Sequence, residues 1–150
     1  MEAPSMKKVE LTPDQIKELT RWADYLRTSG LQQGSGRLRT GDEYCCLGVY
    51  CEMVDPDGWE AESYKQFAMS HRGMETELPL EYEQALGIVH IGEAFAAMND
   101  DLSYTFEKIA DEIMYFIRTG LLTGETEEAL LGVYSQVFHA QYTREELGDN

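Results

Sequence analysis

One stretch without helical periodicity lies between the first two helical segments of the chain: Gln33-Gly34-Ser35-Gly36-Arg37-Leu38-Arg39-Thr40-Gly41-Asp42-Glu43-Tyr44. Its three glycines disfavour a helix, and Thr40-Gly41-Asp42 is typical of a turn between two short strands. The stretch therefore predicts a small antiparallel β-hairpin, with residues 37–39 and 43–45 as its strands.

Helical periodicity fills most of the chain on both sides of this hairpin. Apolar spacing of three and four residues predicts helices over about 13–28, 47–54, 79–86, 92–98, 105–118 and 125–142. Thr12, Pro13 and Gln15 form the capping signature of the first helix. Residues 71–73 are expected to form a loop, and residues 59–80 have no clear pattern. The sequence predicts a mostly helical α+β protein.

We expect a single domain over residues 1–150. Within it, residues 12–120 form the core, residues 121–142 contribute an additional C-terminal helix and residues 143–150 form a polar tail. No linker or internal repeat divides the 150 residues. No apolar run approaches the roughly 18 residues of a membrane span, and the N-terminus lacks the apolar core of a signal peptide. Three cysteines within seven residues are typical of reduced thiols rather than of a secreted disulfide framework.

Acidic residues dominate the charge, with a formal net charge of −16. Most of the excess follows Arg72, where 16 acidic residues stand against 3 basic ones. Such a segment repels phosphate backbones, so direct nucleic-acid binding is disfavoured. It either attracts a partner with a basic surface or simply keeps the protein soluble.

Two blocks of sequence resemble a family of small proteins common in bacterial phages and prophages. The family carries Gln-Gly-x-Gly-x-Leu-Arg, then Tyr-Cys-Cys-Leu-Gly-Val, and later Leu-Asn-Asp followed by Ser/Thr-Phe-x-x-Ile-Ala. Here the blocks read Gln33-Gly34-Ser35-Gly36-Arg37-Leu38-Arg39 with Tyr44-Cys45-Cys46-Leu47-Gly48-Val49, and Met98-Asn99-Asp100 with Thr105-Phe106-Glu107-Lys108-Ile109-Ala110. The resemblance implies a phage origin and a location in the host cytoplasm, and it implies no particular activity.

A ligand site is predicted at Arg37, Arg39, Asn99 and Asp100. The Gly-Ser-Gly segment exposes backbone N–H groups beside two arginines, a combination that binds phosphate. The alternatives are that the arginines pair with acidic residues of the same domain, and that Asn99 and Asp100 only end one helix and cap the next.

Two further surfaces are predicted in the C-terminal part. A partner-binding acidic surface would consist of Asp111, Glu112, Glu125, Glu127 and Glu128. A self-association surface would consist of an apolar and aromatic stripe on the last helix, namely Leu130, Val133, Tyr134, Val137, Phe138 and Tyr142. Such a stripe favours a homodimer.

No catalytic set is evident, so we lean towards a protein that is not an enzyme. Cys45 and Cys46 lie at a strand-to-helix junction, where a thiol can be activated, but neither His71 nor His90 is marked as a catalytic base. The cysteine spacing does not match a zinc site, and we expect neither a metal nor a cofactor.

Three functions are compatible with the sequence. The first is a phage accessory protein that binds and inhibits a host defence or regulatory component. The second is a binder that sequesters a small phosphate-bearing or nucleotide signalling molecule. The third is a Cys-dependent hydrolase.

Overall fold

In the computed structural model, which describes residues 7–133, helix α1 (Pro13–Thr28) begins at the capping box that the sequence predicts. Gln15 N donates to Thr12 Oγ1 at 3.1 Å, and Thr12 N donates to Gln15 Oε1 at 2.9 Å. These two bonds satisfy N–H groups that the first helical turn leaves free. The helix buries Leu19, Trp22, Ala23 and Leu26 along one face.

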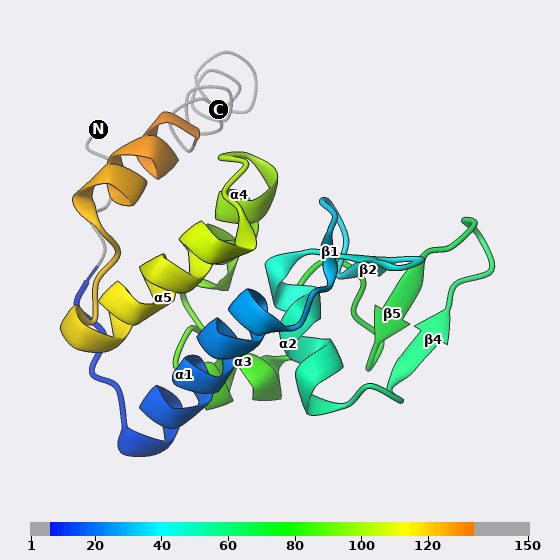
Figure 1. Cartoon of the computed structure of the whole chain (residues 1–150), viewed down its shortest axis with the longest axis horizontal. Coiled ribbons are helices and arrows are strands. Elements are labelled where there is room, and N and C mark those ends of the chain that lie inside the picture. The colour runs from blue at the N-terminus through cyan, green and yellow to red at the C-terminus, as the bar shows by residue number, and fades with distance from the viewer. Residues whose placement is uncertain (1–6, 134–150) are drawn as a thin grey trace, which may run out of the picture.

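Trp22, on the buried face of α1, lies at the centre of the hydrophobic core. Helix α1 packs beside α5 (Phe106–Thr119), with α2 (Cys46–Val54) and α4 (Gly92–Asp100) against them (Figure 1). The Trp22 ring meets Phe95 edge-on at 5.4 Å and Tyr50 at 6.1 Å. Its indole Nε1 donates to the carbonyl of Cys46 at 2.9 Å, which joins α1 to the start of α2. The short α3 (Leu80–Leu86) also packs on α1. The mostly helical α+β architecture is confirmed.

The hairpin is confirmed and is part of a three-stranded sheet. Strands β2 (Arg39–Thr40) and β3 (Glu43–Tyr44) pair antiparallel, while β1 (Gln32–Gln33) runs parallel to β3 on its other side. Gly48 lets α2 pack directly on the chain that enters β2, because a Cβ atom there would lie 1.7 Å from the Leu38 carbonyl oxygen.

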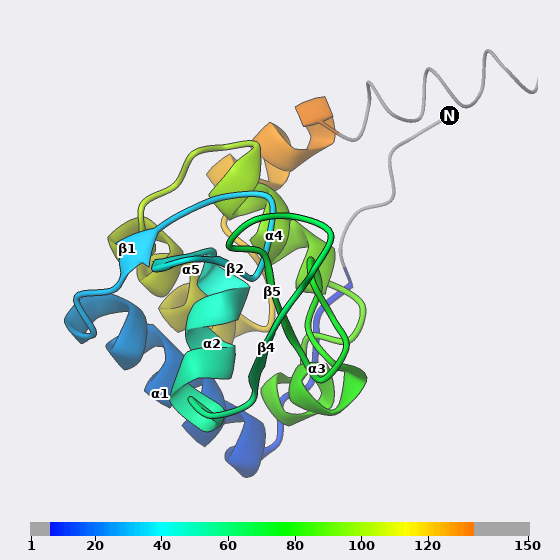
Figure 2. The same ribbon diagram turned by 90° about the vertical axis from the view of Figure 1, so that its right-hand side faces the viewer.

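A second hairpin projects from the side of the domain (Figures 1 and 2). It consists of β4 (Trp59–Ala61) and β5 (Met69–His71), which pair antiparallel. The prediction that residues 71–73 form a loop is wrong at His71, which is the strand partner of Trp59. The His71 side chain is fully buried, 4.8 Å from the Trp59 ring, and its Nε2 hydrogen-bonds Tyr82 Oη at 2.9 Å.

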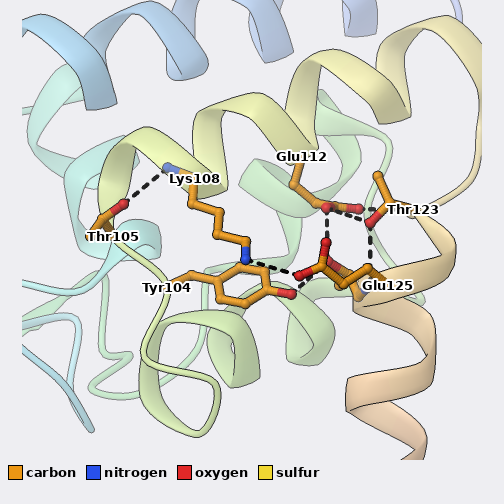
Figure 3. A network of polar contacts seen from close by, with 7 residues as sticks. Tyr104, Thr105, Lys108, Glu112, Thr123 and Glu125 are labelled. Atoms are coloured by element: carbon orange, nitrogen blue, oxygen red, sulfur yellow. Dashed lines mark hydrogen bonds and ion pairs between the residues drawn. The ribbon is translucent and has the colours of Figure 1, made fainter.

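Residues 124–133 are helical, and a buried carboxylate attaches them to α5 (Figure 3). Glu112 accepts hydrogen bonds from Thr123 N at 2.6 Å, Thr123 Oγ1 at 2.9 Å and Thr126 Oγ1 at 2.8 Å. A carboxylate at the positive end of a helix is favourable. The remainder of the predicted last helix, residues 134–142, lies outside the described residues.

The environment of His71 predicts a pH-dependent stability. Burial lowers the pKa of His71 from its usual 6.5, and nearby Asp55 only partly offsets this. Since the unfolded chain then takes up the proton first, His71 favours folding above pH 6.5 and opposes it progressively as the pH falls below that value. One proton changes the unfolding free energy by at most about 1.4 kcal/mol per pH unit.

We therefore predict that His71→Gln loses less stability than the unsubstituted protein between pH 7.5 and pH 5.5, measured by urea unfolding. His90→Gln is the matched control, because His90 is exposed. It should keep the full pH dependence. Equal losses in the His71 variant and the unsubstituted protein would contradict the prediction.

Candidate functional site

The amide side chain of Asn99 joins the two family-like sequence blocks. Asn99 lies in the last turn of α4 and is 5% exposed. Its Oδ1 accepts from Gln33 Nε2 at 2.8 Å and from Cys46 N at 3.1 Å. Its Nδ2 donates to Gly34 O at 2.8 Å and to Asp100 Oδ1 at 2.9 Å. These four bonds use the full capacity of one amide group.

The Gly-Ser-Gly segment is held in place by the same part of α4. Asp100 Oδ1 accepts from Gly36 N at 3.0 Å, and Gln33 Nε2 donates to Tyr104 O at 2.8 Å as well as to Asn99. The sequence predicts that this helix ends at residue 98; in the structure Asn99 and Asp100 are the last two residues of α4, and the chain turns only after Asp100. Their side chains fix the segment at residues 33–36.

This arrangement leaves a polar pocket of about 770 Å³ between the segment, the end of α4 and the tip of the second hairpin. We call it the polar pocket. Its lining is rich in amide, hydroxyl and charged groups and consists of Gln33, Gly34, Ser35, Gly36, Arg37, Thr40, Glu43, Lys65, Asn99, Asp100, Ser103 and Tyr104. The volume lies in the range of ordinary small-ligand sites.

Two cations and two carboxylates face this pocket. Lys65 is exposed and has no ion-pair partner within residues 7–133. Arg37 Nη1 lies 3.6 Å from Glu75 Oε2, and this buried nitrogen makes no hydrogen bond within the described part of the chain. The carboxylates of Glu43 and Asp100 balance these charges.

Of the four predicted ligand residues, Arg39 does not line the polar pocket. Its guanidinium lies over Trp59 at 5.4 Å, 3.8 Å from Glu52 Oε1, and it donates to Gly41 O at 2.7 Å. The predicted strand over residues 37–39 is wrong at Arg37 and Leu38, because β2 begins only at Arg39 and the chain bends before it, so Arg37 and Arg39 do not lie on one strand. Arg37, Asn99 and Asp100 do line the polar pocket, and the sequence analysis missed Lys65.

A second cavity, of about 400 Å³, contains carboxylates and no basic residue. We call it the acidic groove. Its carboxylates belong to Glu77, Glu83, Glu93, Asp100 and Asp101, above an apolar floor that includes Leu47, Leu78, Ala96 and Ala97. Burial, and then the neighbouring carboxylates of Glu77 and Glu93, raise the pKa of Glu83. One helical signal could have revealed this groove: residues 93, 96, 97 and 100 share a face of α4.

The predicted acidic surface, formed by residues of α5 and of the helix that follows it, needs correction. Glu112 is 5% exposed, because it lies on the buried face of α5 with Ile109, Ile113 and Phe116 and binds the following helix. Asp111 pairs with Arg27 Nη2 at 2.6 Å, and Glu125 pairs with Lys108 Nζ at 3.2 Å (Figure 3).

Glu127 is half-buried and Glu128 is exposed. The five predicted residues therefore do not form one open acidic surface.

The predicted self-association surface is only partly described by the structure. Leu130 is 4% exposed and belongs to the core of its own domain, which corrects its assignment to an interface. Val133 lines the acidic groove. Four of the six residues lie outside the described residues: Tyr134, Val137, Phe138 and Tyr142.

The thiols have an environment unlike that of catalytic cysteines. Cys45 Sγ accepts from Gly48 N at 3.4 Å, and Cys46 Sγ donates to Phe95 O at 3.4 Å. Burial raises the pKa of Cys45 to about 12, and it raises the pKa values of Cys46 and Cys51 well above the usual value. A thiol that stays protonated at neutral pH is a poor nucleophile.

Two features of residues 7–133 bear on membranes and metals. No helix within residues 7–133 has the length and apolar character needed to cross a membrane. In that same part of the chain, no three His, Cys, Asp or Glu side chains are grouped as metal ligands.

Comparison with known proteins places the site within a family. A family model described as a domain of unknown function (DUF8296) matches residues 13–116. No curated protein and no solved structure matches the chain. The matched region runs from the start of α1 into α5 and contains every residue that lines the polar pocket. The chain belongs to the DUF8296 family.

Proposed function

We propose that this protein is a non-enzymatic binder that sequesters a small phosphate-bearing molecule in the polar pocket. The observation that carries the proposal is the polar pocket itself, which forms where Asn99 and Asp100 hold the Gly-Ser-Gly segment. Lys65 and Arg37 supply the positive charge for an anionic group. The buried, protonated thiols argue against a hydrolase.

The biological setting is part of the same proposal. From the resemblance of the two sequence blocks we infer that the protein is encoded by a phage and acts in the cytoplasm of the bacterial host. Sequestration of a signalling molecule would then weaken a host response without any chemical step. A homodimer through the C-terminal residues is a further element of this proposal.

A thermal-shift screen with nucleotides, cyclic nucleotides, sugar phosphates and inorganic phosphate tests the proposal. A ligand at about 100 times its Kd stabilises the folded state by about 2.7 kcal/mol, which raises the melting temperature by several degrees. We predict such a shift for at least one phosphate compound and about tenfold weaker binding in Lys65→Ala, a loss of about 1.4 kcal/mol.

Lys17→Ala is the matched control, because Lys17 is an exposed lysine of α1 outside the polar pocket. It should bind as the unsubstituted protein does. If no phosphate compound shifts the melting temperature at millimolar excess, the proposal fails.

The acidic groove favours a second candidate function, the inhibition of a host protein. Its five carboxylates and apolar floor would fit a segment that carries basic and apolar side chains together. Burial is the main cause of the raised pKa of Glu83, and repulsion from the carboxylates of Glu77 and Glu93 adds to it; a basic partner would relieve that repulsion. In this candidate the acidic groove replaces the acidic surface that the sequence predicts on α5 and the following helix.

Binding of an amphipathic lysine- and leucine-containing peptide, followed by fluorescence anisotropy, tests this second candidate. Glu83→Gln combined with Glu93→Gln should weaken binding about tenfold at low salt. Glu10→Gln combined with Glu60→Gln removes the same charge at exposed sites outside the groove and should have little effect. Equal effects of the two pairs would show that only net charge matters.

A further inference from the structure

The charged groups that line the polar pocket indicate which class of phosphate compound it would bind. Its lining contains two cations and two carboxylates, and Arg37 already forms an ion pair with Glu75. A polyphosphate would bring three or four negative charges to a site whose own charges cancel. A monophosphate, with a charge of about −1.5 to −2, is better matched to Lys65 and Arg37.

The two carboxylates can accept hydrogen bonds from donor groups on a ligand. Asp100 uses Oδ1 for Gly36 N and for Asn99 Nδ2, while its Oδ2 has no hydrogen-bond partner among residues 7–133. Glu43 is exposed at the same pocket. An ionised carboxylate only accepts hydrogen bonds, and sugar hydroxyl groups are donors that carboxylates bind in many nucleotide sites. Inorganic phosphate and diphosphate have no sugar hydroxyl groups to offer these carboxylates.

The exposed aromatic ring of Tyr64 contacts Arg37, which lines the polar pocket. Tyr64 precedes Lys65 at the tip of the second hairpin and is 62% exposed. The Arg37 guanidinium lies 5.6 Å from the centre of its ring, and its hydroxyl group donates to Glu75 at 2.7 Å. These contacts fix the ring at its place while leaving much of its surface in solvent. A fixed, exposed ring is a platform on which a base can stack.

We propose that the polar pocket binds a nucleoside monophosphate. Its phosphate lies at Lys65 and Arg37, its ribose hydroxyl groups donate to Asp100 and Glu43, and its base stacks on Tyr64. This inference rests on the proposed function, since it assigns the class of the sequestered molecule. The pocket volume of about 770 Å³ accommodates such a ligand and far exceeds the needs of a free phosphate.

Isothermal titration calorimetry with a graded set of ligands tests the assignment. The set is AMP, GMP, CMP and UMP, together with ATP, ribose 5-phosphate, 2′,3′-dideoxy-AMP and inorganic phosphate. We expect at least one nucleoside monophosphate to bind about tenfold more tightly than ribose 5-phosphate and more tightly than its triphosphate.

Three variants assign the parts of the ligand. Asp100→Asn keeps the oxygen that accepts from Gly36 N and removes the second one, so it should reduce the preference for AMP over dideoxy-AMP. Tyr64→Ala should weaken nucleotide binding about tenfold and leave ribose 5-phosphate unaffected. Phe67→Ala is the matched control, because Phe67 is similarly exposed on the same hairpin but, unlike Tyr64, has no cation–π contact with Arg37 within residues 7–133.

The outcomes separate this inference from the proposed function. If a sugar phosphate or a polyphosphate binds as tightly as every monophosphate, or if Tyr64→Ala and Phe67→Ala behave alike, the nucleoside assignment is wrong and the phosphate-binding function stands. If no phosphate compound binds, both are wrong. Tight binding of a monophosphate that is lost in Tyr64→Ala and Lys65→Ala supports both.

Discussion

One buried amide group holds together parts of the chain that are far apart in sequence. Asn99 lies at the end of α4, and its four hydrogen bonds reach the segment before β2, the first N–H of α2 and the neighbouring Asp100. An isolated buried amide would cost several kcal/mol if these partners were absent, so the segment and the two helices stabilise one another's positions. The position of the Gly-Ser-Gly segment, and with it the polar pocket, depends on this one side chain.

The packing around α2 explains why the segment cannot easily adopt another path. Gly48 brings α2 against the Leu38 carbonyl, where a larger residue would collide. Trp22 holds the start of the same helix through the Cys46 carbonyl. The pocket wall is therefore set between α4 on one side and a rigidly packed α2 on the other. A preformed wall reduces the conformational entropy that the protein must lose when a ligand binds.

Local patterns predicted the helices and the first hairpin well. The capping box at Thr12 and the Gly120 stop of α5 are encoded within a few residues, so the sequence alone is sufficient. The parallel pairing of β1 with β3 is not encoded locally, and neither is the strand at His71. Both depend on contacts with residues ten or more positions away.

The candidate site was predicted in part for the same reason. The sequence predicts Asn99 and Asp100 as site residues, and both line the polar pocket. It does not predict Lys65, which comes from a hairpin whose position no local pattern indicates. Glu112 was assigned to a surface because it is charged, although its place among Ile109, Ile113 and Phe116 gives it a buried position on α5. The chain bends before β2, so Arg37 and Arg39 do not lie on one strand. The sequence pattern around them does not indicate this bend.

Asn99 maintains the loop that forms the polar pocket, and native-state hydrogen exchange of the Asn99→Ala variant is the direct test of this role. Cys46 N donates to Asn99 Oδ1 and Gly36 N donates to Asp100 Oδ1, while Gly34, whose carbonyl accepts from Asn99 Nδ2, donates its own N–H to Tyr44 O. We predict that the exchange of these three N–H groups accelerates at least about tenfold, corresponding to about 1.4 kcal/mol, relative to the amides of α1 and α5 in the same variant. Exchange that accelerates equally throughout the domain, or not at all at these three amides, would show that Asn99 does not hold this loop in place.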